Sequence, residues 1–342
     1  MRTTRTTWCS APAACGSRRP QVAADHARGV AAAAIRWWTG SARTSIGRMV
    51  EIACDESGFS GTNLLDPTSP VLVHASVDLT VPEAHDVVAV LRSGFDGPPE
   101  HRSSRLLRPQ HGPLLAWFLD ALAGRTEVVV VDKRDFVAAR VLELFTQEPS
   151  YAAGTRLGAD HADGVRALRH RTALLTAFVD LVRTTRRRPV DGAAVAAFLA
   201  TVPADEPALR VLGRAHVEHV VARLVDGDPA YPPPLEPLVP ALAETVLRWS
   251  GGTRSVAVVH DEQSALTPSR VARLGTFLAD AVAPAPPPLR SFVQVDSRSD
   301  PRVQVADLVA GVARRRAQQV ASTYPSSSGV PSSRSRSTVD AG

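Results

Sequence analysis

The sequence contains a single lysine, Lys133, against 38 arginines, and only 5% of its residues are aromatic. It also lacks any apolar run of the roughly 18 residues that a membrane span needs. Its three cysteines, Cys9, Cys15 and Cys54, show no recurring spacing. They therefore form neither a disulfide framework nor a zinc site, and they suit a reducing compartment. These absences predict a cytoplasmic protein without a membrane partner.

The net charge of +5 is concentrated at the two ends of the chain. Residues 1–48 hold eight Arg and one Asp, and residues 314–342 hold five Arg and one Asp, so the residues between them carry a net charge of −6. This mildly acidic body offers no broad electrostatic attraction for a polyanion. Any binding of nucleic acid must depend on local features.

Both ends differ in composition from the middle of the chain. Residues 1–48 are rich in Ala, Arg, Thr and Ser without helical or strand periodicity. They are expected either to be a disordered extension or, as we favour, to precede a true translation start at Met49. Residues 317–342 are rich in Ser, with Pro and Arg, and are expected to form a disordered tail.

Residues 49–316 alternate between short apolar strands and amphipathic helices. Strands are expected at 50–54, 71–79, 127–131, 255–260 and 291–295. Helices are expected at 82–92, 113–123, 135–145, 268–281 and 301–316. Residues 160–250 are mostly helical in pattern and are expected to form an insertion before the later core strand. Strands covered by helices in this way predict a layered α/β domain.

Two carboxylates follow apolar strands. Asp55 ends the first strand and Asp261 ends a later one, and each is followed by Glu. Because side chains alternate along a strand, Asp55 and Glu56 should point to opposite faces. If the two strands are neighbours, Asp55 and Asp261 lie close enough to repel, and a divalent cation would remove that cost. The alternative for Asp55 is a turn residue before Gly58.

Asp307 lies two turns into the last predicted helix, among apolar residues. Burying a lone Asp there is costly unless the carboxylate is paired or binds a metal ion. Ala310 and Gly311 follow it, and such small residues are expected to let the helix approach the sheet closely. The alternative places Asp307 on the solvent-exposed face of the helix.

The arrangement of these motifs resembles the domain-of-unknown-function 3800 family over residues 50–315. Members open with a strand that runs into Asp-Glu-Ser-Gly and close with a serine-containing stretch followed by Leu-Gln-x-Ala-Asp-Leu. The matching segments here are Asp55-Glu56-Ser57-Gly58, Glu100 in a loop, Asp261-Glu262, Asp296-Ser297, and Val303-Gln304-Val305-Ala306-Asp307-Leu308.

The resemblance implies an RNase H-like fold, a mixed sheet covered by helices, with a site of four carboxylates that binds Mg²⁺ or Mn²⁺. Carried over residue by residue, it points to Asp55, Glu100, Asp261 and Asp307. The family's mid-chain acid is usually followed closely by a lysine, whereas His101 and Arg102 follow Glu100 here.

Lys133 follows the strand at 127–131, and the family often has a lysine after this strand. In a chain with no other lysine, it is a candidate to neutralise a phosphate or a carboxylate, and Arg102 and Arg105 are candidate phosphate contacts. The alternative for Lys133 is an exposed turn residue. His260 and His101 each flank one of the acids and are either metal ligands, proton shuttles or polar packing residues.

These residues predict a divalent-metal-dependent nuclease that hydrolyses phosphodiester bonds of DNA or RNA. Asp55 is the expected bridging ligand of two metal ions that activate water and stabilise the leaving oxygen. Two other functions stay open. One is a non-catalytic module that binds nucleic acid or a protein partner, which the acidic body and scarce aromatics favour. The other is a metal-dependent phosphatase.

Overall fold

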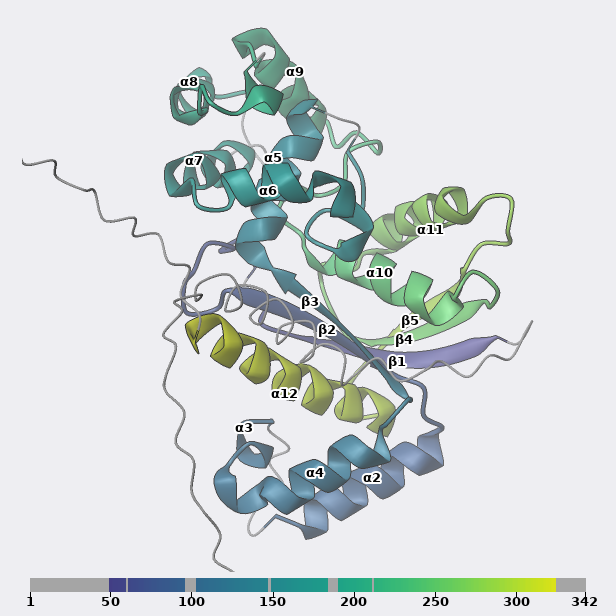
Figure 1. Cartoon of the computed structure of the whole chain (residues 1–342). Helices are drawn as coiled ribbons and strands as arrows, with labels where there is room; N and C mark the ends of the chain where they lie inside the picture. The colour runs from purple at the N-terminus through teal and green to yellow at the C-terminus, as the bar shows by residue number, and fades with distance from the viewer. Residues whose placement is uncertain are drawn as a thin grey trace, which may run out of the picture. The chain divides into compact units, whose positions relative to one another are not determined.

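The computed structural model describes residues 49–323 except 60, 96–102, 147–148, 184–189 and 211. Five strands form one sheet in the order β3-β2-β1-β4-β5 (Figure 1). They are β1 (Val50–Ser57), β2 (Val71–Val77), β3 (Thr126–Asp132), β4 (Val256–Asp261) and β5 (Leu289–Val295). β2 runs antiparallel to β1 and β3, and β4 runs parallel to β1 and β5. The predicted α/β class is therefore confirmed, with a mixed sheet.

Alternating side chains of β1 serve two separate cores. Ile52 and Cys54 belong to the larger hydrophobic cluster on one face of the sheet, and Ala53 belongs to a second cluster on the other face. β2 is buried along its whole length for the same reason. A strand covered on both faces is apolar without alternation, and this explains why the sequence at 71–77 reads as a nearly continuous apolar run.

Two helices lie directly on opposite faces of the sheet. α12 (Pro301–Thr323) packs on β1 and β2, and α10 (Leu238–Ser250) packs on β2 and β3 (Figure 1). Trp249 of α10 donates from its indole Nε1 to Ser76 Oγ of β2 at 2.7 Å. The last helix of the stretch expected as an insertion thus contributes to the sheet's own core.

α12 begins as the sequence predicts, because the Asp300 carboxylate accepts a hydrogen bond from Arg302 N at 2.9 Å. It continues to Thr323, beyond the expected end at 316. Ala310 and Gly311 were both expected to let α12 approach the sheet, but Gly311 makes a different contact. A Cβ on Gly311 would lie 2.0 Å from Ser103 Oγ, so Gly311 makes room for α3 (Ser103–Leu106) rather than for the sheet.

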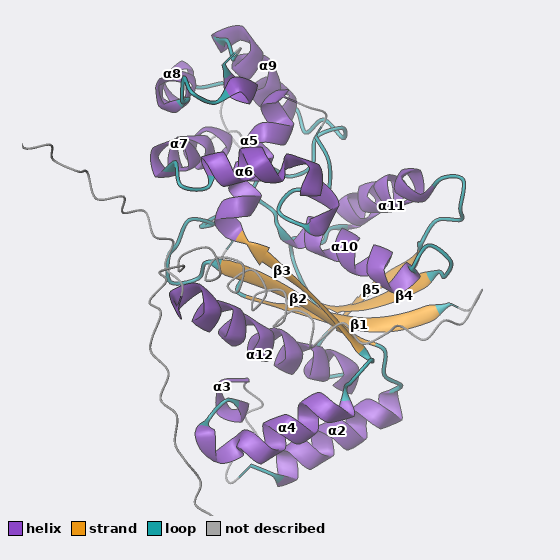
Figure 2. Cartoon of the chain, viewed as in Figure 1, coloured by secondary structure: helices purple, strands orange, loops and turns teal. Residues whose placement is uncertain are grey.

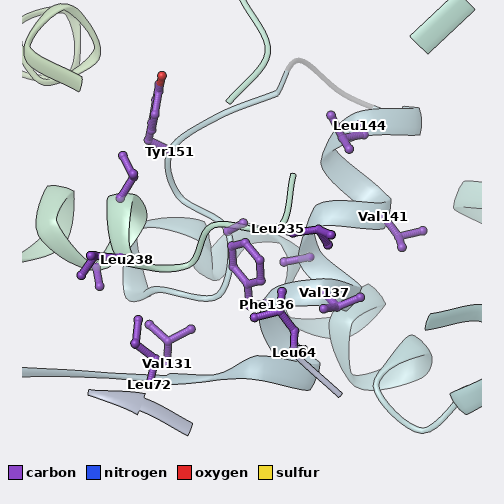
Figure 3. Packing of buried hydrophobic residues seen from close by; sticks show 14 of the residues in the cluster. Leu64, Leu72, Val131, Phe136, Val137, Val141, Leu144, Tyr151, Leu235 and Leu238 are labelled. Atoms are coloured by element: carbon purple, nitrogen blue, oxygen red, sulfur yellow. The ribbon is translucent and has the colours of Figure 1, made fainter. Parts of the chain in front are cut away.

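Below α12, α2 (Val81–Ser93) and α4 (Gly112–Ala121) form a further layer with α3 and the short 3₁₀ helix at Pro109–His111 (Figure 1). On the other side of the sheet, α11 (Pro268–Val282) packs beside α10 and on β5. The side chains of this larger cluster interlock around Phe136, Leu238 and Leu72 (Figure 3).

The remaining helices form a group around α5 (Figure 2). They are α5 (Lys133–Thr146), α6 (Ala162–Leu168), α7 (Thr172–Arg183), α8 (Gly192–Thr201) and α9 (Arg214–Val225), with 3₁₀ helices at Arg156–His161 and Pro207–Leu209. Asp135 was expected to cap α5. That expectation is wrong, because the helix starts at Lys133 and the Asp132 carboxylate accepts hydrogen bonds from Arg134 N and Asp135 N.

No helix among the described residues is both long enough and apolar enough to cross a membrane. Residues 1–48, for which an extension or an upstream segment was expected, and most of the predicted tail lie outside the described residues.

Candidate functional site

The register of β1 and β4 brings Asp55 and Asp261 side by side. Cys54 pairs with His260 in these parallel strands, so the next residues, Asp55 and Asp261, face the same way at the same edge of the sheet. Two residues earlier, Ala53 belongs to the core under α12. The two aspartates therefore point toward α12, as expected for neighbouring strands.

α12 supplies the third carboxylate of this group, Asp307. Burial raises the pKa of Asp307, and the charge of Asp261 raises it further. Burial also raises the pKa of Asp55 to about 9, and the charges of Glu56, Asp307 and Asp261 add to this effect. Each group thus senses its neighbours, and they lie near enough to repel one another when ionised. Three elements far apart in sequence meet at one edge of the sheet.

Glu56 is a fourth carboxylate at this edge, and the sequence did not assign it. Glu56 faces the α10 side of the sheet and pairs with His74 of the neighbouring strand β2. The expected opposite orientation of Asp55 and Glu56 is therefore confirmed. The Glu56 side chain is only 9% exposed. Burial raises its pKa, the charges of Asp261 and Asp307 add to this, and a hydrogen bond from Gln263 acts in the opposite direction. Because Glu56 lies at the end of β1, the charges of Asp261 and Asp307 on the other face still reach it around the edge of the sheet.

One oxygen of Glu56 has no donor. Gln263 Nε2 donates to Oε1, but Oε2 is buried and accepts no hydrogen bond within the described part of the chain. The nearest basic group is His260 Nε2, 4.0 Å away. A buried carboxylate oxygen without a donor costs free energy, so a cation or a hydrogen-bond donor at this point would be stabilising.

The tautomer of His260 explains why Glu56 Oε2 stays without a donor. His260 Nδ1 lies 2.9 Å from the carbonyl oxygen of Asp261, which can only accept, so Nδ1 carries the proton. Burial lowers the pKa of His260 to about 4, so the ring is neutral at ordinary pH and its Nε2 is an acceptor. That atom accepts from His74 Nε2 at 3.2 Å. His74 Nδ1 is then an acceptor, and the Thr245 hydroxyl, which also lies 3.0 Å from the Ala241 carbonyl oxygen, donates to it at 2.8 Å.

This series of hydrogen bonds from Thr245 through His74 to His260 gives every nitrogen of the two imidazole rings a partner. His74 is the clearest signal that the sequence analysis missed, since it is the one ionisable residue in the otherwise uncharged run at 71–77. Its partner His260 was considered as a ligand, a shuttle or a packing residue. The hydrogen bonds favour packing and orientation, with both rings fully buried.

Lys133 is buried rather than exposed in a turn. Its Nζ donates to Ser69 Oγ at 3.2 Å, and Ser69 Oγ in turn lies 3.4 Å from the carbonyl oxygen of Gly58. Burial lowers the pKa of Lys133 to about 8, with the nearby charge of Arg314 acting in the same direction and that of Asp66 against it. Lys133 thus supports the connection between β1 and β2, and its contact with a phosphate stays a prediction.

Three of the expected residues, Glu100, His101 and Arg102, lie outside the described residues. Arg105 is described and lies in α3, where its guanidinium carbon is 4.8 Å from the centre of the Phe95 ring.

The donor atoms at this edge suit a hard cation, although they are not arranged around a common centre. Within the described ranges, no three His, Cys, Asp or Glu side chains stand in a geometry ready to hold a metal ion. Asp55 Oδ1 accepts from Glu56 N at 2.6 Å, and Asp261 Oδ1 accepts from Ser297 N at 3.0 Å. With these backbone hydrogen bonds, the side chains of Asp55 and Asp261 do not converge on one point. Carboxylate oxygens are nevertheless the ligands that Mg²⁺ and Mn²⁺ prefer.

Comparison of the chain with family models, with curated proteins and with solved structures found no match.

Proposed function

We propose that this chain is a divalent-metal-dependent hydrolase of phosphodiester bonds, with the cation held by Asp55, Asp261 and Asp307. The observation that carries the proposal is the convergence of these carboxylates, with Glu56 beside them, at one edge of the sheet. Burial and mutual repulsion raise the pKa values of Asp55, Glu56 and Asp307. A site that is electrostatically costly when empty is a functional candidate, because a bound cation would remove the cost.

The fit of a cation is supported by the chemistry of the donors, because Asp55, Asp261 and Asp307 offer only carboxylate oxygens. The resemblance of the sequence motifs to the domain-of-unknown-function 3800 family adds support. A mixed sheet with helices on both faces, and acids on the first strand, a later strand and a late helix, is the arrangement expected of an RNase H-like fold. Glu100 joins the proposal through the resemblance alone.

A bound Mg²⁺ or Mn²⁺ would activate a water molecule and stabilise the charge on the leaving oxygen of a phosphodiester. The chain's own residues would hold the metal ion and orient the groups around it. Asp55 lies on β1, which pairs with β4, the strand of Asp261, and contacts α12, the helix of Asp307. The neutral chain of His74 and His260 donates to the carbonyl of Asp261 and thereby fixes the backbone at the end of β4.

The test is Mn²⁺ affinity, measured by isothermal titration calorimetry on the full chain, followed by cleavage assays on single-stranded and duplex DNA and RNA. We expect Asp55→Asn and Asp307→Asn each to weaken Mn²⁺ binding by about tenfold or more, equivalent to about 1.4 kcal/mol. Without added metal, Asp55→Asn should unfold at a higher temperature than the wild type at pH 8. Folding must make Asp55, whose pKa rises from 3.8 to about 9, take up a proton at this pH, and an amide avoids that cost. That result also shows that the variant folds.

The matched control is Glu262→Gln, which changes an exposed carboxylate directly after Asp261 and should leave the affinity unchanged. Equal Mn²⁺ affinity in the wild type and both Asn variants would refute the metal site. Tight, Asp55-dependent Mn²⁺ binding without cleavage of any substrate would instead identify a non-catalytic module.

A further inference from the structure

A cavity of about 510 Å³ opens beside the carboxylate edge, on the α10 side of the sheet. Its wall includes Phe59, four residues after Asp55, and Ser264, three residues after Asp261. The rest of the wall comes from Gly61 and Thr62, the ends of α7 and α9, the segment 227–236, Ala265, and the start of α11 with Thr267 before it. Its volume is in the range of sites for small organic ligands. Gln263, the residue before Ser264, donates to Glu56, so the cavity lies close to the carboxylate edge without including its acids.

The charges around this cavity favour an anion. Three arginines line it, Arg183, Arg270 and Arg273, against two carboxylates, Asp228 and Glu236. Asp228 is committed elsewhere, since it forms an ion pair with Arg223. Glu236 Oε2 lies 4.0 Å from Arg270 Nη1. Arg183 Nη1 lies 3.7 Å from Asp180 Oδ1. The excess positive charge at the cavity therefore rests chiefly on Arg273.

Two of the arginines are held in place. Arg270 Nη1 donates to the carbonyl oxygen of Ala265 at 2.7 Å, and Arg183 Nη2 donates to that of Thr62 at 2.8 Å. Arg273 lies three residues after Arg270 and shares its face of α11. Among the described residues, Arg273 forms no hydrogen bond or salt bridge, and the charge of Asp228 acts on it only at longer range. Its guanidinium can therefore contact a ligand.

Buried polar groups lie behind α11, next to the cavity. The Tyr151 ring lies 5.3 Å from that of Phe277, one turn after Arg273. The Tyr151 hydroxyl points away from the surrounding hydrophobic side chains (Figure 3) and has no hydrogen-bond partner in the part of the chain that is described. Burial raises its pKa, while the charges of Arg273, Arg140 and Arg270 oppose the rise.

Arg140 also has polar atoms without a partner behind α11. It is completely buried, and its Nη1 donates to Glu143 Oε2 and to the carbonyl of Ser150, both at 2.8 Å. Its Nε and Nη2 find no acceptor among the described residues. Behind α11 the protein thus leaves guanidinium donors of Arg140 unsatisfied although Arg140 is paired with Glu143.

The cavity also offers aromatic faces. Phe59 and Tyr231 line it and are half-buried, and the Arg223 guanidinium carbon lies 5.2 Å from the centre of the Tyr231 ring. Aromatic rings beside arginines form the combination that stacks nucleic-acid bases and holds their phosphates. Apolar surface alone would not select a charged ligand, and arginines alone would not select a planar one.

We infer that this cavity binds one nucleotide of a nucleic-acid strand, with its phosphate at Arg270 and Arg273 and its base against Phe59 or Tyr231. The inference rests on the proposed function for its meaning, since it places a nucleotide next to the carboxylate edge. Binding itself requires no metal ion, so it can be measured separately.

The probe is adenosine 5′-monophosphate, titrated calorimetrically into the full chain in EDTA, with adenosine as the comparison. We expect the wild type to bind the monophosphate about tenfold or more tightly than adenosine. Arg273→Ala should weaken monophosphate binding by a similar factor, Arg273→Lys should weaken it less, and Tyr231→Ala should weaken both ligands. Thermal unfolding of each variant reports whether it folds.

The control is Arg166→Ala on α6, which removes an exposed arginine outside the cavity. Asp55→Asn should bind the monophosphate like the wild type, so failure of this inference and failure of the metal site give different results. No binding by the wild type at millimolar ligand, equal affinity for adenosine, or an Arg273→Ala variant that binds normally would each overturn the inference.

Discussion

At the scale of single residues, the candidate site is defined by what each carboxylate lacks. Asp55, Asp261 and Asp307 face one side of the edge and Glu56 faces the other, and burial rather than a partner dominates the raised pKa of Asp55, Glu56 and Asp307. The neutral His260 cannot donate to Glu56 Oε2, because its proton lies on Nδ1. A group that the protein leaves unsatisfied in a buried place is more informative than a charged residue on the surface.

Gly58 shapes the turn that follows Asp55. Its φ is 91°, and a Cβ would lie 2.3 Å from the carbonyl oxygen of Val71 and 2.9 Å from Arg314 Cδ. We expect Gly58→Ala to lower the free energy of unfolding by about 2 kcal/mol or more, from backbone strain plus the clash with backbone. Urea denaturation measures the change.

Gly61→Ala is the matched control, because Gly61 also has a positive φ, 57°, but nothing lies within 4 Å of a new Cβ. It should cost only the strain, about 1 kcal/mol. Equal losses for the two variants would show that the close approach to Val71 is unimportant.

At the scale of elements, helix ends and helix faces decide where functional groups stand. Asp300 fixes the start of α12, so Asp307 comes two turns later on the face that meets the sheet. Asp132 fixes the start of α5, so Lys133 becomes a buried first residue instead of a turn residue. A cap that shifts by a few residues therefore changes which side chain enters the core.

The start of α2 gives a pH-dependent prediction. Thr80 and Glu83 form a capping box, and the hydrogen bond from Arg125, followed by those from Thr80, lowers the pKa of Glu83 to about 2. A lowered pKa stabilises the fold above the unfolded value near 4.5, and this stabilisation is lost as the pH falls toward 2. Glu83→Gln should therefore cost about 1 kcal/mol at pH 7 and almost nothing at pH 2.

Chemical denaturation at both pH values measures the difference. Asp86→Asn, an exposed change one turn along the same helix and outside the capping box, is the matched control. A Glu83→Gln effect of the same size at both pH values would contradict the charge-based account of the cap.

At the scale of the whole described unit, the sheet separates two hydrophobic clusters. The helices α8 and α9 contribute only to the larger cluster. α8 and α9 pack chiefly on α5 and α7, whereas β1 lies between two strands and beneath two helices. We expect hydrogen exchange of β1 amides such as those of Ile52 and Cys54 to be at least about tenfold slower than exchange in α8 and α9, since peripheral units open locally.

Native-state exchange followed by NMR or mass spectrometry distinguishes the two regions. Similar protection throughout would mean that the helical group and the sheet unfold as one cooperative unit.

The sequence by itself determined the elements and three of the candidate carboxylates. Apolar strands ending at Asp55 and Asp261, and an Asp among apolar residues of the last helix, follow from local patterns that need no partner to be visible. Only the tertiary structure decided which strands are neighbours, that Lys133 is buried, that Gly311 faces α3, and that Glu56 has an oxygen without a donor. These depend on pairing and packing between segments up to about two hundred residues apart, and periodicity along one segment contains no information on what covers it.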